Sequence, residues 1–77
     1  MTLLDQILLA VRRKVAMDGF LRRHIVIVFN HETILVLMDD PKFLKRATLG
    51  TVRPHRINDI PFWVDKMQVE KYRIVQR

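Results

Sequence analysis

The chain has 77 residues, of which 49% are hydrophobic and 29% are charged, a composition typical of one small globular domain and not of a disordered segment. It contains no cysteine, which excludes disulfides and thiolate metal sites and fits a cytoplasmic protein. Fourteen lysines and arginines against eight acidic residues give a net charge of +6, which favours polyanionic partners without identifying one.

No part of the sequence indicates a membrane protein. The apolar stretch Leu3–Val11 is interrupted by polar residues and lacks the basic start of a secretory signal. No run approaches the roughly 18–20 apolar residues that cross a bilayer. We therefore expect a soluble protein of the cytoplasm (of the host cytoplasm if the protein is viral) with no membrane partner.

Residues Thr2–Asp18 are predicted to form an amphipathic helix. Thr2 and Asp5 have the spacing of an N-terminal capping pair, and Gly19 stands where a left-handed C-terminal residue is expected. The apolar residues recur with helical spacing, at Leu3, Leu4, Ile7, Leu8, Val11 and Val15.

A central strand and a second helical segment are expected next. His24–Phe29 contains "IVIVF", which is apolar on both faces and therefore favours a strand covered on two sides. Residues 31–39 allow either a helix capped by Asn30 or a strand at Ile34–Met38 joined through a tight "HE" turn. Favoured two-residue hairpin turns contain Asn-Gly, Asp-Gly or a leading Gly, so the helix is preferred.

Asp40 and Pro41 then predict the start of another helical turn, because Asp is a good N-cap and Pro suits the first helical position. Its residues Phe43, Leu44 and Ala47 are expected to face inward, and Gly50 to close or bend the element.

The final third is predicted to be β-rich. Residues 51–57 contain Pro54 and suit an edge strand or irregular extended chain, and "NDIP" is a turn signal. "FWVDK" and "KYRIV" should form a C-terminal hairpin in which Tyr72 and Ile74 share one face. The prediction is a single α+β domain over residues 1–77, in the approximate order α-β-α-β-β.

Most catalytic chemistries lack their residues. There is no serine or cysteine to serve as a nucleophile, and the two glycines cannot make a phosphate-binding loop. His24 and His31 flank the predicted strand, too far apart to share a metal ion, and Asp40 is better explained as a helix cap. We therefore expect no enzyme activity, no catalytic residue, no metal and no cofactor.

A small toxin-like endoribonuclease stays open as an alternative. His55 lies between Arg53 and Arg56, and with Tyr72 it supplies residue types for proton transfer and phosphate binding. The Gly-Ser-His signature of one such class is missing before His24, where "LRRH" stands instead.

Basic clusters provide a candidate nucleic-acid surface. Those at residues 12–14 and 22–23 are joined by a short turn and would make one phosphate-contacting patch if the fold brings them together. If the fold keeps them apart, each basic cluster is simply a solvent-exposed part of the domain surface with no binding role. The residues proposed to bind nucleic acid are Arg12, Arg13, Lys14, Arg22, Arg23, Arg53 and Arg56.

Phe62, Trp63 and Tyr72 are the candidate protein interface, or stacking surfaces for single strands. Strand alternation places Phe62 and Trp63 on opposite faces, so one of them should point away from the core.

The order of "NHET", "DDPKFL", "LG", "PFWVD" and "KYRIV" over residues 23–75 resembles small bacteriophage or prophage proteins, apart from the inserted "TVRPHRIND". The resemblance implies an accessory or assembly protein of a virus or mobile element that acts by binding. Our leading hypothesis is therefore a non-enzymatic protein that works through protein–protein contacts, including self-association. Sequence-independent nucleic-acid binding is the first alternative and the ribonuclease is the second.

Overall fold

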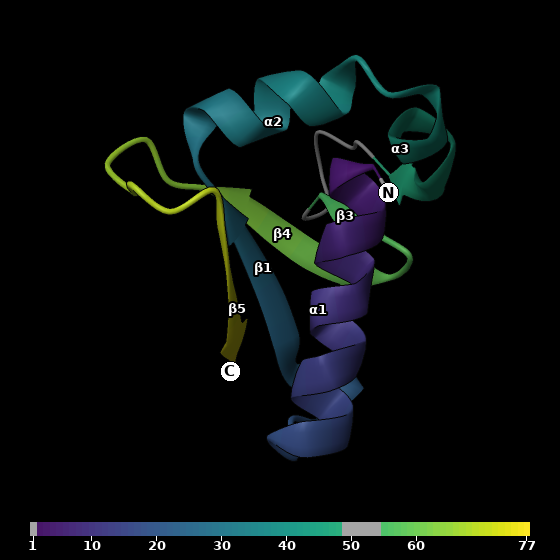
Figure 1. Cartoon of the computed structure of the whole chain (residues 1–77), viewed down its shortest axis with the longest axis vertical. Helices are drawn as coiled ribbons and strands as arrows, with labels where there is room; N and C mark the ends of the chain where they lie inside the picture. Colours follow the sequence, from purple (N-terminus) through teal and green to yellow (C-terminus); the bar gives the residue numbers. More distant parts are fainter. Residues whose placement is uncertain (1, 49–54) are drawn as a thin grey trace.

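A mixed five-stranded sheet with helices against one of its faces organises the chain (Figure 1). The computed structural model describes residues 2–48 and 55–77. The strand order is β2-β3-β4-β1-β5. In chain order the elements are α1 (Leu3–Met17), the 3₁₀ turn η1 (Arg22–His24), β1 (Ile25–Phe29), α2 (His31–Met38), α3 (Pro41–Arg46), β2 (Ala47–Thr48), β3 (Arg56–Ile57), β4 (Ile60–Val64) and β5 (Tyr72–Gln76). The predicted α+β fold is confirmed.

Helix α1 has the predicted caps. The backbone N–H of Asp5 donates to the Thr2 hydroxyl, and the Thr2 N–H donates back to the Asp5 carboxylate. Hydrogen bonds from Thr2 lower the pKa of Asp5 below its ordinary value. The stability that ionised Asp5 contributes through this cap is therefore fully present above the ordinary carboxylate pKa. It is lost as the pH falls through the lowered pKa of Asp5. Gly19 has a φ of +73°, as expected for a left-handed residue after a helix.

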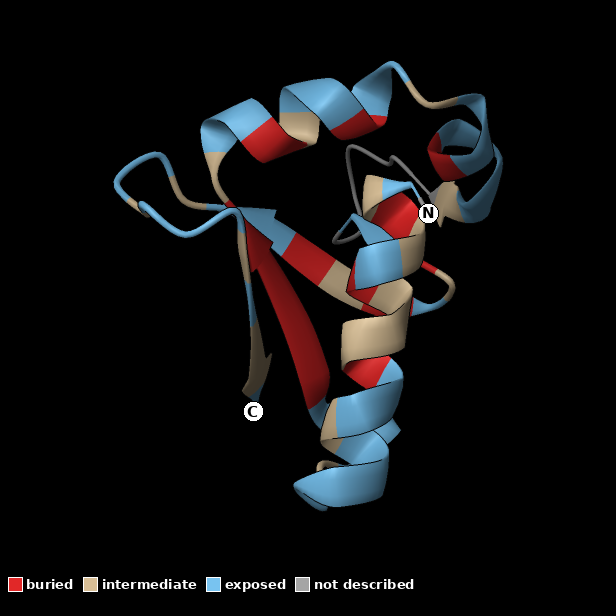
Figure 2. Cartoon of the chain, viewed as in Figure 1, coloured by how far each residue is buried: buried red, intermediate tan, exposed pale blue. Residues whose placement is uncertain are grey.

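Strand β1 is buried along its whole length and lies between two others (Figure 2). It pairs in parallel with β4, where Ile27 is opposite Phe62, and antiparallel with β5, where Ile27 is opposite Ile74. The last two strands therefore do not form the predicted C-terminal hairpin. β1 is apolar on both faces and needs a hydrogen-bonding partner on each edge, and β4 and β5 fill these two places. The connection of seven residues between them, 65–71, is long enough to cross the end of β1.

The hairpin that does form joins β3 to β4 through the predicted "NDIP" turn. Its two central residues, Asn58 and Asp59, have φ values of 48° and 64°. Positive φ at both central positions is what a type I′ turn requires, and Asn and Asp tolerate it better than most other side chains.

The segment after β1 is helical, as preferred from the sequence. The Asn30 side chain accepts a hydrogen bond from the Thr33 N–H at 2.8 Å and so caps α2. In α3, Asp40 is the cap and Phe43 is fully buried, but Leu44 is 46% exposed, so its predicted inward position is wrong. Adjacent helical residues point about 100° apart, and in α3 it is Phe43 that faces the core. The expectations for Gly50 and Pro54 lie outside the described residues.

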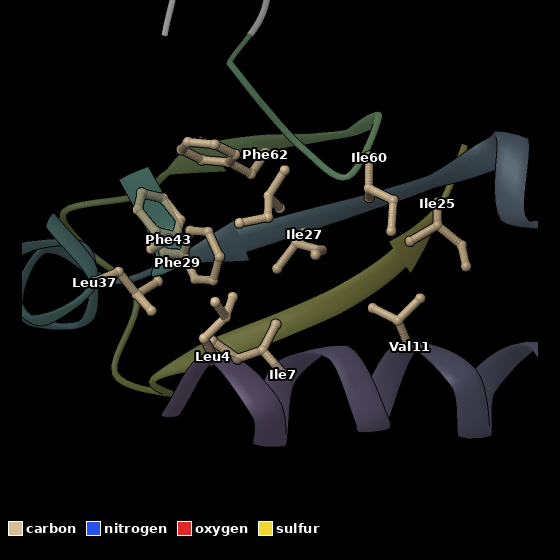
Figure 3. Packing of buried hydrophobic residues seen from close by; sticks show 11 residues of the cluster. Leu4, Ile7, Val11, Ile25, Ile27, Phe29, Leu37, Phe43, Ile60 and Phe62 are labelled. Atoms are coloured by element: carbon tan, nitrogen blue, oxygen red, sulfur yellow. The ribbon is translucent and has the colours of Figure 1, made fainter. Parts of the chain in front are cut away.

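One hydrophobic cluster joins the helices to the sheet (Figure 3). Alternate residues of β1, namely Ile25, Ile27 and Phe29, face α1. Phe62 of β4 packs against Phe29 with ring centroids 5.3 Å apart, and against Phe43 of α3 at 5.9 Å. All three helices thus place their buried apolar residues against the same face of the sheet, through Leu4, Ile7 and Val11 of α1, Leu37 of α2 and Phe43 of α3.

Replacing Phe43 by Ala should lower the free energy of unfolding by about 3–5 kcal/mol, because it removes a buried aromatic ring and leaves a cavity. The neighbouring replacement Leu44→Ala removes a half-exposed side chain and should change it by roughly 0.5 kcal/mol. Urea unfolding followed by Trp63 fluorescence measures both. Equal losses would contradict the orientation of α3.

Candidate functional site

The second face of the sheet is not covered by the described helices. Directly paired residues share a face, so Val28 lies in one row with Trp63 of β4 and Arg73 of β5. Val26 pairs with Val75 on the same face. Val26 and Val28 are 0% and 7% exposed, yet neither belongs to the cluster beneath the helices. They are the buried apolar floor beneath a surface, which we call the open face, whose side chains include Trp63 and Arg73.

Trp63 is the aromatic residue that this face presents to solvent. It is 48% exposed, and the Arg77 guanidinium lies over its ring, 5.3 Å from the centroid. Such a cation–π pair holds both side chains in place. Phe62, also proposed as an interface residue, is instead buried in the core because strand alternation turns it towards the helices. Tyr72 is partly buried on that same helical side.

A basic hollow of about 330 Å³ adjoins the open face. Pro61 forms part of its wall, and Asp59 is its acidic residue. The Arg77 N–H donates to the His24 carbonyl at 2.7 Å, which joins the end of β5 to η1. The cationic and titratable basic side chains that line the hollow are Arg23, His24, Arg56 and Arg77.

The β3–β4 turn positions two arginines at this end of the molecule. Arg22 Nη2 donates to the Asn58 carbonyl at 3.3 Å, and Arg56 Nη1 donates to the Asp59 carbonyl at 3.4 Å. Both acceptors are backbone oxygens, so neither bond neutralises the positive charge. The ion pairs within residues 2–48 and 55–77 are Lys14–Asp18 and Arg73–Asp65, and neither involves an arginine of the basic hollow.

A second hollow of about 460 Å³ lies beside the first and shares two of its residues, Arg23 and Asp59. Leu21 and Ile60 give it an apolar wall, and Arg22 completes its lining. We call it the apolar hollow. Arg23 and Asp59 therefore border both the basic and the apolar hollow.

The cations of α1 do not join this site. Arg12 lines a different hollow, together with Arg46 of α3 and Asp5. Lys14 pairs with Asp18 at 3.0 Å and lies over the Phe20 ring, 5.5 Å from the centroid. None of the three cations of α1 lines the basic hollow or the apolar hollow, and Arg13 is exposed on the helix. Arg53 lies outside the described residues.

Sequence reasoning missed two arginines of the site, Arg73 and Arg77, and also Asp59, which lines both hollows. The alternation of side chains along β5 could have identified the two arginines, because the sequence already placed Tyr72 and Ile74 on one face of this strand. The same alternation, continued by one more residue, places Arg73, Val75 and Arg77 together on the other face.

His55 and Tyr72, the proton-transfer residues of the ribonuclease alternative, are not brought together. The His55 ring stacks on Phe62, with centroids 5.6 Å apart, beside β3. Tyr72 lies on β5, and two strands separate β3 from β5, a distance of about 14 Å at the usual strand spacing. Within the described residues no three His, Asp or Glu side chains converge as metal ligands.

Comparison of the chain with protein-family models, with curated proteins and with solved structures gave no match. Among the helices of the described residues, none combines the length and the apolar character that a membrane crossing requires.

The turn that positions Arg22 and Arg56 can be tested through Asp59. Asp59→Gly should leave the free energy of unfolding unchanged or raise it, because glycine adopts the observed φ of 64° without strain. Asp59→Val should lower it by about 1–2 kcal/mol, since a β-branched residue disfavours that conformation. Thermal unfolding of the two variants decides; a more stable valine variant would be incompatible with the turn.

Proposed function

We propose that the open face and the basic hollow bind single-stranded nucleic acid without reading its sequence. The observation that carries the proposal is the juxtaposition of an exposed Trp63, stacked on Arg77, with a hollow that Arg77 itself helps to line. One arginine therefore belongs to both an aromatic platform and a cationic pocket.

The electrostatic part of the proposal rests on the arginines of the basic hollow. Arg23, Arg56 and Arg77 line one concave surface, and the ion pairs of the described chain lie elsewhere. A net charge of +6 adds a long-range attraction for polyanions. Phosphates that bind there release counterions, so the affinity should fall steeply with salt.

Single strands are favoured over duplexes by Trp63. Its ring is half-exposed, and an unpaired base can stack on it, whereas the bases of a duplex are already stacked on each other. Stacking accepts every base, because every base has an aromatic face. The arginines of the hollow suit contacts to phosphate, which position a strand but carry no sequence information.

The proposal predicts distinct effects of two kinds of substitution. Trp63→Ala should weaken binding of a labelled single strand by about 1–3 kcal/mol, because it removes the stacking platform. Arg23→Ala and Arg56→Ala should each reduce the slope of log affinity against log salt by about one, because each removes one phosphate contact. Fluorescence anisotropy with single-stranded and duplex DNA and RNA, over a salt series, measures all of these.

Arg12→Ala is the matched control, because it removes the same charge from a hollow on α1. It should leave the slope nearly unchanged. Absence of single-strand binding at about 50 mM salt would overturn the proposed function.

A second candidate function, protein–protein contact, is favoured by apolar side chains on the outside of α2 and α3. Leu35, Val36 and Leu44 are 55%, 58% and 46% exposed. Exposed apolar groups of this kind mark contact surfaces more often when they are neighbours than when they are scattered. An accessory or assembly role, as implied by the resemblance to small bacteriophage proteins, would use this side of the molecule and leave the open face free.

This second candidate predicts self-association through α2. Light scattering should give a mass above the 9.2 kDa of one chain, and Val36→Lys should restore the monomer mass because it places a charge in the contact. Met17→Lys is the control, since Met17 is 80% exposed at the end of α1. A monomer mass for the unaltered protein at every concentration would refute self-association.

A further inference from the structure

We infer that the basic hollow holds a phosphate monoester, the terminal phosphate of a nucleotide or of a nucleic-acid strand. The inference rests on the proposed function and narrows its ligand from any phosphate to a terminal one. Three independent features support it: the charge of the lining, the way its arginines are held, and the hollow next to it.

The charge of the lining matches a monoester better than a diester. Three arginines and one aspartate, Arg23, Arg56, Arg77 and Asp59, leave two positive charges among the side chains of the hollow. A phosphate monoester carries a charge of about −1.5 to −2 at neutral pH, whereas each backbone diester carries one negative charge. The monoester also offers three terminal oxygens as acceptors, one for each guanidinium, and a diester offers fewer.

Two of the three arginines of the hollow, Arg56 and Arg77, are held in place before a ligand arrives. Arg56 donates to the Asp59 carbonyl at 3.4 Å. The Arg77 backbone is tied to the His24 carbonyl at 2.7 Å, and its guanidinium rests on the Trp63 ring. These contacts occupy backbone oxygens and a π face and no carboxylate, so the guanidiniums keep their full charge for an anion. Side chains that are already ordered lose less entropy on binding.

The adjoining apolar hollow explains why the phosphate would belong to a nucleotide. It shares Arg23 and Asp59 with the basic hollow and adds the apolar wall of Leu21 and Ile60. A nucleoside attached to the phosphate can enter it, and the Asp59 carboxylate can accept a hydrogen bond from a base amino group. Arg77 lines the basic hollow and also lies over the Trp63 ring, so the next base of a strand whose terminal phosphate occupies the hollow can stack on Trp63.

The test compares single strands of identical sequence that carry a 5′-phosphate, a 3′-phosphate or hydroxyl groups at both ends, with the label placed internally. We expect one phosphorylated strand to bind on the order of tenfold more tightly than the hydroxyl strand, since the monoester adds charge-assisted hydrogen bonds. Arg56→Gln and Arg77→Gln should abolish this preference. Arg73→Gln, on the open face but outside the hollow, should weaken all strands and keep the preference.

A nucleoside monophosphate is added as a competitor to identify the source of the phosphate. If it displaces the phosphorylated strand at equal concentration, the hollow takes free nucleotides, and if it does not, the hollow takes strand ends; both results support a monoester site. Equal binding of all strands with intact overall affinity would overturn the monoester inference and leave the proposed function standing. Absence of binding by every strand would overturn the proposed function itself.

Discussion

The burial of β1 on both faces is the constraint on which the rest of the structure depends. Five consecutive apolar residues, Ile25–Phe29, are removed from water, and each such side chain contributes about 1.5–3 kcal/mol when it is fully buried. A strand of this kind requires a partner on each edge and cover on each face. β4 and β5 supply the edges, and the helices supply the cover for Ile25, Ile27 and Phe29.

The other face of β1 is covered differently, and the open face is the consequence. Val26 and Val28 have no described helix over them, so their neighbours in the sheet must shield them. Trp63 and Arg73, paired on either side of Val28, are large side chains with an apolar body and a polar tip. Such residues can cover apolar surface while their ends stay in water. The same side chains that shield the floor are therefore the ones that remain accessible to a ligand.

The connection between β4 and β5 secures this arrangement. Gln68 Nε2 donates to the Val28 carbonyl at 2.9 Å, and Arg73 Nε donates to Gln68 Oε1 at 2.8 Å. Asp65 lies 3.9 Å from the Arg73 guanidinium and donates its own N–H to the Phe29 carbonyl. One glutamine thus links the backbone of the central strand to an arginine of the open face, and limits how far that arginine can move.

Local signals predicted the elements well, because their causes lie within a few residues. The cap at Thr2, the β-branched run of β1 and the absence of a favoured turn at His31-Glu32 each act over short distances in the chain. The order of the strands could not be predicted in the same way. Placing β1 between β4 and β5 depends on how the whole sheet buries its apolar residues, and no local pattern encodes it.

Local patterns also could not predict which residues surround Arg22 and Arg23 in the site. From the sequence, this pair had significance only if other cations were brought beside it, and those of α1 were the nearest candidates along the chain. The structure brings Arg56 and Arg77 instead, from β3 and from the residue after β5, because β1 begins at η1 and its neighbours in the sheet end or turn at the same level. A short basic run at the start of a buried strand is usually an ordinary solvated edge. Here it acquires partners because the strand is central, so the property that made β1 predictable is also what assembles the hollow.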